Sequence, residues 1–217
     1  MKILWDKEYK CPYCGKSFSS KKVFIDAIKL EKYDDDLKPI YKNVNPIYYQ
    51  PIVCPFCNYT EYETEFEKSL SPIITQKLEP TLKKIKKLNL TDVRNLDDAI
   101  KAFAMLIIVL TVKDEPCKLG DAYLKSAWLL REKGDEKEEK IALAHTLKHF
   151  EKCYRYSNVE GKMEEKILFY LGEINRQFGR KKESIEWFSQ LMKRHGKSSS
   201  YYVKVARDRW QSMRGSH

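Results

Sequence analysis

The sequence predicts an α+β fold that is mostly α, with a small β head (residues 1–66) ahead of an antiparallel helical array (residues 67–213). Two stretches of the head, KCPYCGKSF (10–18) and VCPFCNYT (53–60), repeat one pattern of cysteine, proline, aromatic residue and cysteine. From about residue 66 the apolar residues recur instead at the spacing of one helix face. A chain of 217 residues is long enough for two modest domains of this kind.

The paired cysteines have the spacing of metal ligands. A Cys-x-x-Cys turn supplies two thiolates from one backbone corner, and zinc takes four ligands in a tetrahedron. The residue after each pair, Gly15 or Asn58, is of a type that tolerates positive φ. The two turns therefore predict a closed, zinc-ribbon-like site for one structural zinc ion. One alternative to zinc is an iron centre bound by the same four cysteines. The other is that the four thiols bind no metal. The expected ligands are Cys11, Cys14, Cys54 and Cys57.

The segment between these turns has the composition of strands and turns. Residues 23–33 (VFIDAIKLEKY) are rich in β-compatible residues and end at three aspartates, residues 34–36, which predict a solvated turn rather than a metal site. Residues 45–53 (NPIYYQPIV) carry two prolines, so they are expected to be extended and to form an edge strand.

Three later segments share a helical pattern in which a small residue is followed by a phenylalanine four positions on and an apolar residue three further. Upstream of the last two, the pattern predicts partner helices over residues 121–133 and 162–178, ending at Gly134 and Gly179. Residues 201–210 predict a closing helix. The recurring positions are Ala99, Phe103 and Leu106, then Thr146, Phe150 and Cys153, then Ser184, Phe188 and Leu191.

The last helix pair resembles a tetratricopeptide repeat, although Asn175, Ser184 and Leu191 depart from it. In such repeats the first helix of each pair lines a groove that holds a protein or peptide. The alternative is that a neighbouring helix covers this stripe and leaves packing and i,i+3 salt bridges. The resemblance implies that the partner-facing positions are Lys166, Phe169, Glu173 and Arg176.

The remaining reactive residues favour structural roles. His145, His149 and Cys153 recur every four residues and could form a metal face, but Cys153 holds an apolar position and the histidines flank the packing face. Cys117 is expected to be a lone thiol. No catalytic triad, glycine-rich phosphate loop or paired catalytic carboxylate stands out, so the sequence favours a protein that is not an enzyme and has no small-molecule substrate.

The net charge of +10 is unevenly placed, because residues 1–66 hold ten lysines and ten acidic residues. Any affinity for nucleic acid is therefore expected to be weak and to come from the basic tail. The longest apolar run, residues 102–112, is too short for a membrane span, so we expect a cytoplasmic protein. There, cysteines are expected as metal ligands or buried thiols rather than disulfides. Residues 214–217 look like a tag remnant.

The order of motifs resembles an uncharacterised bacterial family known as domain of unknown function 2225. The shared stretches are the first CPxC turn, NPIYY (45–49), VCPFCNYTEYETEF (53–66), SAWLLREKGDEKEE (126–139), YLGEINRQFGRKKESIEWFS (170–189) and VARDRW (205–210). Two positions depart from the family: Asn58 replaces the usual glycine, and residues 24–25 are Phe-Ile where basic and small polar residues are common. The resemblance implies the architecture and no activity.

Together these features predict a non-enzymatic scaffold, stabilised by zinc, that binds a protein or peptide partner through the groove of its helical array. The alternative is a nucleic-acid-associated zinc-ribbon protein that uses the basic helical tail.

Overall fold

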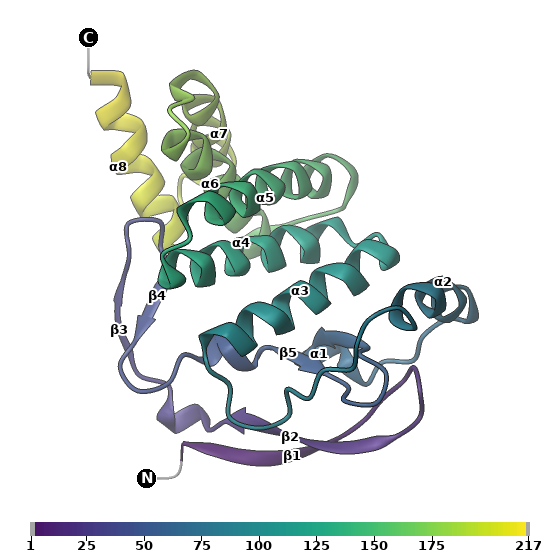
Figure 1. The fold of residues 1–217 in the computed structure, drawn as a ribbon. Helices are drawn as coiled ribbons and strands as arrows, with labels where there is room; N and C mark the ends of the chain where they lie inside the picture. Colours follow the sequence, from purple (N-terminus) through teal and green to yellow (C-terminus); the bar gives the residue numbers. More distant parts are fainter. Residues whose placement is uncertain (1–2, 216–217) are drawn as a thin grey trace.

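The computed structural model describes residues 3–215, so residues 216–217 of the expected tag remnant lie outside it. Strands and short 3₁₀ helices (η) form the first part of the chain and helices form the rest, which confirms the predicted α+β, mostly α class (Figure 1). The strands are β1 (Leu4–Lys10), β2 (Ser17–Val23), β3 (Leu30–Tyr33), β4 (Pro39–Tyr41), β5 (Pro51–Val53) and β6 (Thr60–Tyr62), with η1 (Ile25–Ala27) and η2 (Pro46–Tyr49) between them. The helices are α1 (Glu63–Phe66), α2 (Pro72–Leu82), α3 (Leu96–Lys113), α4 (Pro116–Lys133), α5 (Glu136–Tyr156), α6 (Gly161–Gln177), α7 (Lys181–His195) and α8 (Tyr201–Gly215).

The head is built from three antiparallel hairpins. β1 pairs with β2 from Leu4 opposite Val23 to Lys10 opposite Ser17, and the first cysteine pair forms their connection. The second pair connects β5 to β6 in the same way, and β3 pairs with β4. Each sheet among the described residues has two strands. Because a two-stranded sheet is marginally stable alone, the head needs support from other contacts.

The segment between the cysteine pairs differs from the prediction. Residues 23–33 are interrupted by η1, and residues 45–53 begin with η2 before the strand β5. The Asn45 side chain accepts a hydrogen bond from the Ile47 N–H, and Pro46 occupies the first position of η2, where its fixed φ suits a helical turn. This cap outweighs the extended tendency of the prolines.

The expected solvated turn at residues 34–36 is also wrong at Asp36, which is buried. Its carboxylate accepts hydrogen bonds from Trp128 Nε1 (3.1 Å) and from Arg131 Nη2 (2.8 Å), both on α4. The β3–β4 hairpin is therefore attached to the helical array through its turn, as Figure 1 shows along the side of the molecule.

Local signals decide where the helices begin and end. Asn95 and Asp98 form a capping box at the start of α3. Gly134 follows α4 with a φ of 82° and Gly179 follows α6 with a φ of 72°, so both helices end at the predicted glycines. This left-handed conformation costs glycine little because it has no Cβ.

The helix pairs pack through a repeated contact between a glycine and a phenylalanine. A Cβ added at Gly172 of α6 would lie 2.5 Å from Cδ1 of Phe188 on α7. Gly120 of α4 meets the ring of Phe150 on α5 in the same way. The phenylalanines of the predicted repeat therefore fill the space above a glycine on the partner helix, which lets the two helices approach closely.

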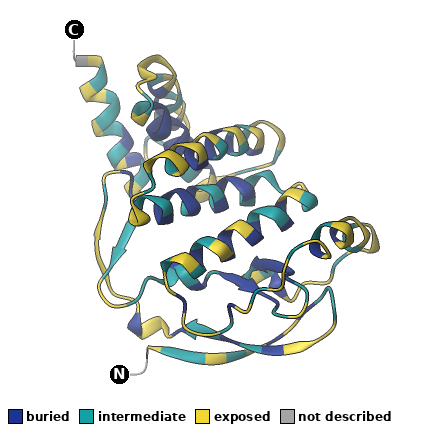
Figure 2. Ribbon diagram, viewed as in Figure 1, coloured by how far each residue is buried: buried dark blue, intermediate teal, exposed yellow. Residues whose placement is uncertain are grey.

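The closing helix is present as α8, whose Val203 and Ala206 are fully buried against the preceding helices. At the other end of the array, one hydrophobic cluster joins Tyr9 and Phe66 of the head to Leu78 of α2 and to Val109 of α3. The buried residues thus run from the head into the helices across residue 66 (Figure 2). None of the described helices is long and apolar enough to cross a membrane.

Candidate metal centre

The two cysteine turns converge on one point of the head. The Sγ atoms of Cys11, Cys14, Cys54 and Cys57 all lie within 4.8 Å of one another. Across the two turns, Cys11 Sγ lies 3.6 Å from Cys57 Sγ, and Cys14 Sγ lies 3.7 Å from Cys54 Sγ. These distances place four potential thiolate ligands around a single position, so the cluster could hold a metal ion.

We call residues 11–15 the first knuckle and residues 54–58 the second. Both have the same backbone hydrogen bonds. Gly15 N–H donates to the Cys11 carbonyl and Asn58 N–H donates to the Cys54 carbonyl, each over 2.9 Å. Gly15 and Asn58 have φ values of 72° and 63°. The left-handed residue after each pair turns the chain so that both cysteines face the same side.

Asn58 does more than tolerate this conformation. Its side-chain amide donates to the carbonyls of Ile85 and Lys86, over 3.2 Å and 3.1 Å, and its carbonyl oxygen accepts from Leu88 N–H over 2.9 Å. The side chain is thus saturated by the segment that follows α2. These bonds could not be predicted from the sequence, because the partners lie about thirty residues further along the chain.

Three of the thiols, those of Cys11, Cys54 and Cys57, influence one another. Hydrogen bonds from Cys11 and Cys57 lower the pKa of the Cys54 thiol. Hydrogen bonding to Cys54 raises the pKa of Cys11, and bonding to Cys11 raises that of Cys57. A metal cation among these sulfurs would favour their thiolate forms, which are the forms that bind a metal.

The surroundings of the cluster are aromatic and shield two of its four cysteines from solvent. Cys11 and Cys54 are fully buried, and Cys14 and Cys57 are partly exposed. The rings of Tyr13 and Tyr59 lie nearly parallel with centroids 6.4 Å apart, and Phe66 packs against Tyr59. A closed tetrahedral set of four thiolates in such a shell leaves no position for a reactive water, so a bound ion would be structural.

The four expected groove residues do not line an open groove. Phe169 and Glu173 on α6 are fully buried, because α8 lies over them. The Phe169 ring lies 5.4 Å from that of Tyr202, and Glu173 forms ion pairs with Arg176 and Arg209.

The other two positions are also engaged. Lys166 forms an ion pair with Asp121 of α4, and Arg176 forms an ion pair with Glu173 at i,i+3 spacing. These residues therefore fit the alternative drawn from the sequence, in which a neighbouring helix covers the stripe. They do not form an open groove for a partner.

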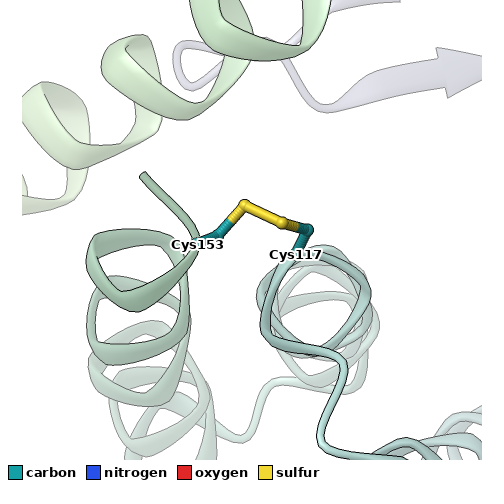
Figure 3. Close-up of a disulfide and its surroundings, with 2 residues drawn as sticks. All are labelled: Cys117 and Cys153. Carbon is teal, nitrogen blue, oxygen red and sulfur yellow. A yellow bond between two sulfur atoms is a disulfide. The ribbon is translucent and has the colours of Figure 1, made fainter. Parts of the chain in front are cut away.

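The expectation of a lone thiol at Cys117 is wrong. Figure 3 shows Cys117 and Cys153 joined by a disulfide between the first turn of α4 and the last turn of α5, with their Cα atoms 4.9 Å apart. A signal was present in the sequence, since each cysteine lies eighteen residues from Asp135 at the turn between the two helices. In an antiparallel helix pair, residues equidistant from the turn lie opposite each other.

Because its sulfur is bonded to Cys117, Cys153 cannot act with His145 and His149 as a metal ligand. The two histidine rings instead stack with Tyr123, with centroids 4.7 Å and 5.4 Å from it. Burial lowers the pKa of His149, helped by the neighbouring His145. Among the described residues, the knuckle cysteines are the one group with metal-ligand geometry.

The chain carries the knuckles first, then the helix pairs and then the closing helix. We compared it with known proteins and protein families. No curated protein and no solved structure matches the chain. One family model, described as "Uncharacterized protein conserved in bacteria (DUF2225)", matches residues 4–213. Because this match covers nearly the whole chain, the protein belongs to that bacterial family.

Proposed function

We propose that the protein is a non-enzymatic scaffold in which one zinc ion holds the two knuckles together and a partner protein docks on the open edge of β3. The observation that carries the docking site is the exposure of every residue of this strand. β4 is the one strand that pairs with β3 among the described residues, so the other edge of β3 presents unpaired backbone groups.

The support for zinc is the donor set. Four thiolates in a closed tetrahedron suit Zn²⁺, whose d¹⁰ shell has no geometric preference of its own, and they leave no coordination position for a water. Iron can use the same four sulfurs, so the metal must be identified directly. Elemental analysis of tag-free protein should give one zinc per chain, and X-ray absorption should give four sulfur neighbours. Iron in the site, or a folded head without metal, would contradict the proposal.

The support for a docking edge is that the hairpin is rigidly held while its outer strand is free. Lys38 Nζ donates to the Trp128 carbonyl over 3.1 Å, and Arg131 Nη1 pairs with Asp34 over 3.2 Å. From the other side, Arg209 of α8 donates to the Asp35 carbonyl. A strand fixed in this way loses little entropy when another chain adds to it.

An aromatic pair lies next to this edge. The ring of Tyr33 on β3 lies 5.3 Å from that of Tyr201 at the start of α8, and each side chain is about half exposed. Leu37 and Tyr202 line a hollow of about 170 Å³ beside them. Exposed tyrosines around a small hollow are typical of binding hot spots. The partner is therefore an extended segment that pairs with β3 and inserts one apolar side chain beside Tyr33 and Tyr201.

The test uses the full chain as bait in extract of its native host, followed by purification of the captured complex. Amide hydrogen exchange at residues 30–33 should slow in the complex, and the double variant Leu30→Asp, Tyr33→Asp should lose the partner. Tyr156→Asp is the matched control, because Tyr156 is 80% exposed and lies at the far end of α5. A complex that leaves β3 exchange unchanged, or a double variant that captures as well as the control, would exclude this edge.

A further inference from the structure

A cavity of about 580 Å³ lies between the head and the helical array, within the size range of small-molecule sites. Val23, Ile25 and Ile28 line it from the head, Asp121 and Lys125 line it from α4, and Met163 lines it from α6. It is separate from the β3 edge, because neither Leu30 nor Tyr33 contributes to its wall.

The α4 wall of the cavity carries a charge cluster that is not balanced. Asp121 pairs with Lys125 over 2.6 Å and also with Lys166 of α6. Tyr62 Oη donates to the same carboxylate over 2.6 Å. The Asp121 and Lys125 side chains are each 16% exposed, so one carboxylate faces two ammonium groups in largely buried surroundings.

Lys125 is the amine of this cluster that a ligand in the cavity can reach. Asp121 and Lys125 line the cavity and Lys166 does not. Asp121 is the one carboxylate that pairs with either amine among the described residues. The Lys125 ammonium also lies 4.7 Å from the centroid of the Tyr62 ring. Because an ammonium has three donor hydrogens, a donor remains for a ligand after Asp121 and the ring are satisfied. Burial lowers the pKa of Lys125 and the Lys166 charge adds to the effect, although Asp121 opposes both.

The other two lysines of the wall differ from Lys125. Lys22 pairs with Glu63 over 2.5 Å, and Lys118 pairs with Glu115 over 2.6 Å and with Glu65 over 3.5 Å. Glu63 and Glu65 also line the cavity, so these two lysines are matched by carboxylates of the same wall. Both side chains are about twice as exposed as that of Lys125, so solvent also screens their charge. Lys125 is therefore the least exposed ammonium of the cavity wall, and a monoanion beside it would neutralise the excess positive charge of the Asp121, Lys125 and Lys166 cluster.

The rest of the wall is mostly apolar, and its rim is open to solvent. Ile25 and Met163, on opposite sides, are 81% and 48% exposed. Large apolar side chains around a cavity mouth are unfavourable in water and are stabilised when a ligand covers them. The site thus offers one cationic contact inside and an apolar surface toward the mouth.

We propose that this cavity binds a carboxylate with an apolar body, with the carboxylate on the Lys125 ammonium and the body against Ile25, Ile28 and Met163. A monocarboxylate matches the single excess charge. A neutral ligand of the same shape would cover the Asp121, Lys125 and Lys166 cluster and leave its excess positive charge without a counter-charge, which is costly.

Decanoate is the probe, titrated into the full-length protein by calorimetry below the concentration at which it forms micelles. We expect one molecule per chain. Decan-1-ol has the same chain without the charge and should bind about tenfold or more weakly, since a charge-assisted hydrogen bond is lost. Decylammonium should not bind. The absence of saturable decanoate binding, or equal affinities for decanoate and decanol, would overturn the proposal without the use of any variant.

The variant Lys125→Met locates the site, because it removes the ammonium, keeps an apolar stem and leaves Asp121 paired with Lys166. Decanoate should bind this variant about tenfold or more weakly, and decanol should bind it as it binds the wild type. Lys133→Met is the control on the same helix, where Lys133 pairs with Asp97 outside the cavity. Equal loss in both variants, or no loss in either, would rule out Lys125 as the contact.

Discussion

The head and the helical array reach a stable fold by different means. In the array, each helix buries an apolar face against the next, and the α4–α5 pair is closed by a disulfide within the chain. In the head, the β1–β2 and β5–β6 hairpins bring four cysteine thiols to one point, while the β3–β4 hairpin is attached to the array through its turn. We infer that the array is stabilised by groups the chain itself supplies, whereas the head depends on a metal ion from outside.

The largest expected effect follows from loss of one knuckle ligand. Cys54→Ser leaves an incomplete tetrahedron, and structural zinc contributes on the order of 10 kcal/mol to the folding of small domains. Hydrogen exchange should become fast in β1, β2, β5 and β6, and in the faces of α2 and α3 that share their hydrophobic cluster.

The helices α4 to α7 should keep their protection in this variant. A strong chelator added to the wild type should produce the same exchange pattern, which separates metal loss from an effect of the serine. The difference between the two regions would disappear if the whole chain unfolded together, or if the head stayed protected in both experiments.

Removal of the disulfide tests the other half of the comparison. The bond closes a loop with a sequence separation of 36, for which loop entropy predicts a stabilisation of about 3–4 kcal/mol. The double variant Cys117→Ser, Cys153→Ser should lower the free energy of unfolding of the array by up to that amount, measured by urea denaturation of α-helical circular dichroism. The metal content should stay at its wild-type value. A fall in bound metal would show that the two regions are not independent.

A smaller effect is expected where the helix pairs touch. Gly172→Ala places a methyl group against the Phe188 ring and should cost about 1–3 kcal/mol through overpacking. The second substitution Phe188→Leu should recover part of this loss, because it clears the space that the methyl group needs. If Gly172→Ala is neutral in urea denaturation, the close approach of α6 and α7 is not what limits their packing.

The smallest expected effect distinguishes the two knuckles from each other. Asn58→Gly keeps the positive φ but deletes three hydrogen bonds to residues 85–88, at a cost of about 1–2 kcal/mol. The reciprocal change Gly15→Asn meets no atom within 4 Å of the added Cβ, so its cost is limited to the strain of a φ of 72°, which asparagine tolerates better than most residues. Thermal unfolding of the two metal-loaded variants gives the comparison. Equal melting temperatures would mean that the Asn58 bonds add nothing to stability.

The features that the sequence determined by itself are those set by neighbouring residues. The knuckles could be recognised because Cys-x-x-Cys followed by Gly15 or Asn58 specifies one turn. The helix ends at Gly134 and Gly179 could be recognised because a left-handed residue closes a helix locally. The pattern around Phe150 and Phe188 predicted the packing faces, since residues four apart share one side of a helix.

Tertiary structure decided what depends on residues far apart in the chain. Arg209 reaches the Asp35 carbonyl across 174 positions, and α8 covers Glu173 in the same way, so a stripe that looks free along one helix is buried. Asp36 is buried rather than solvated because Trp128 and Arg131 supply donors from α4. Local patterns specify φ, ψ and the side of a helix, but the partners that satisfy a buried charge or cover an apolar face are chosen only when distant segments meet.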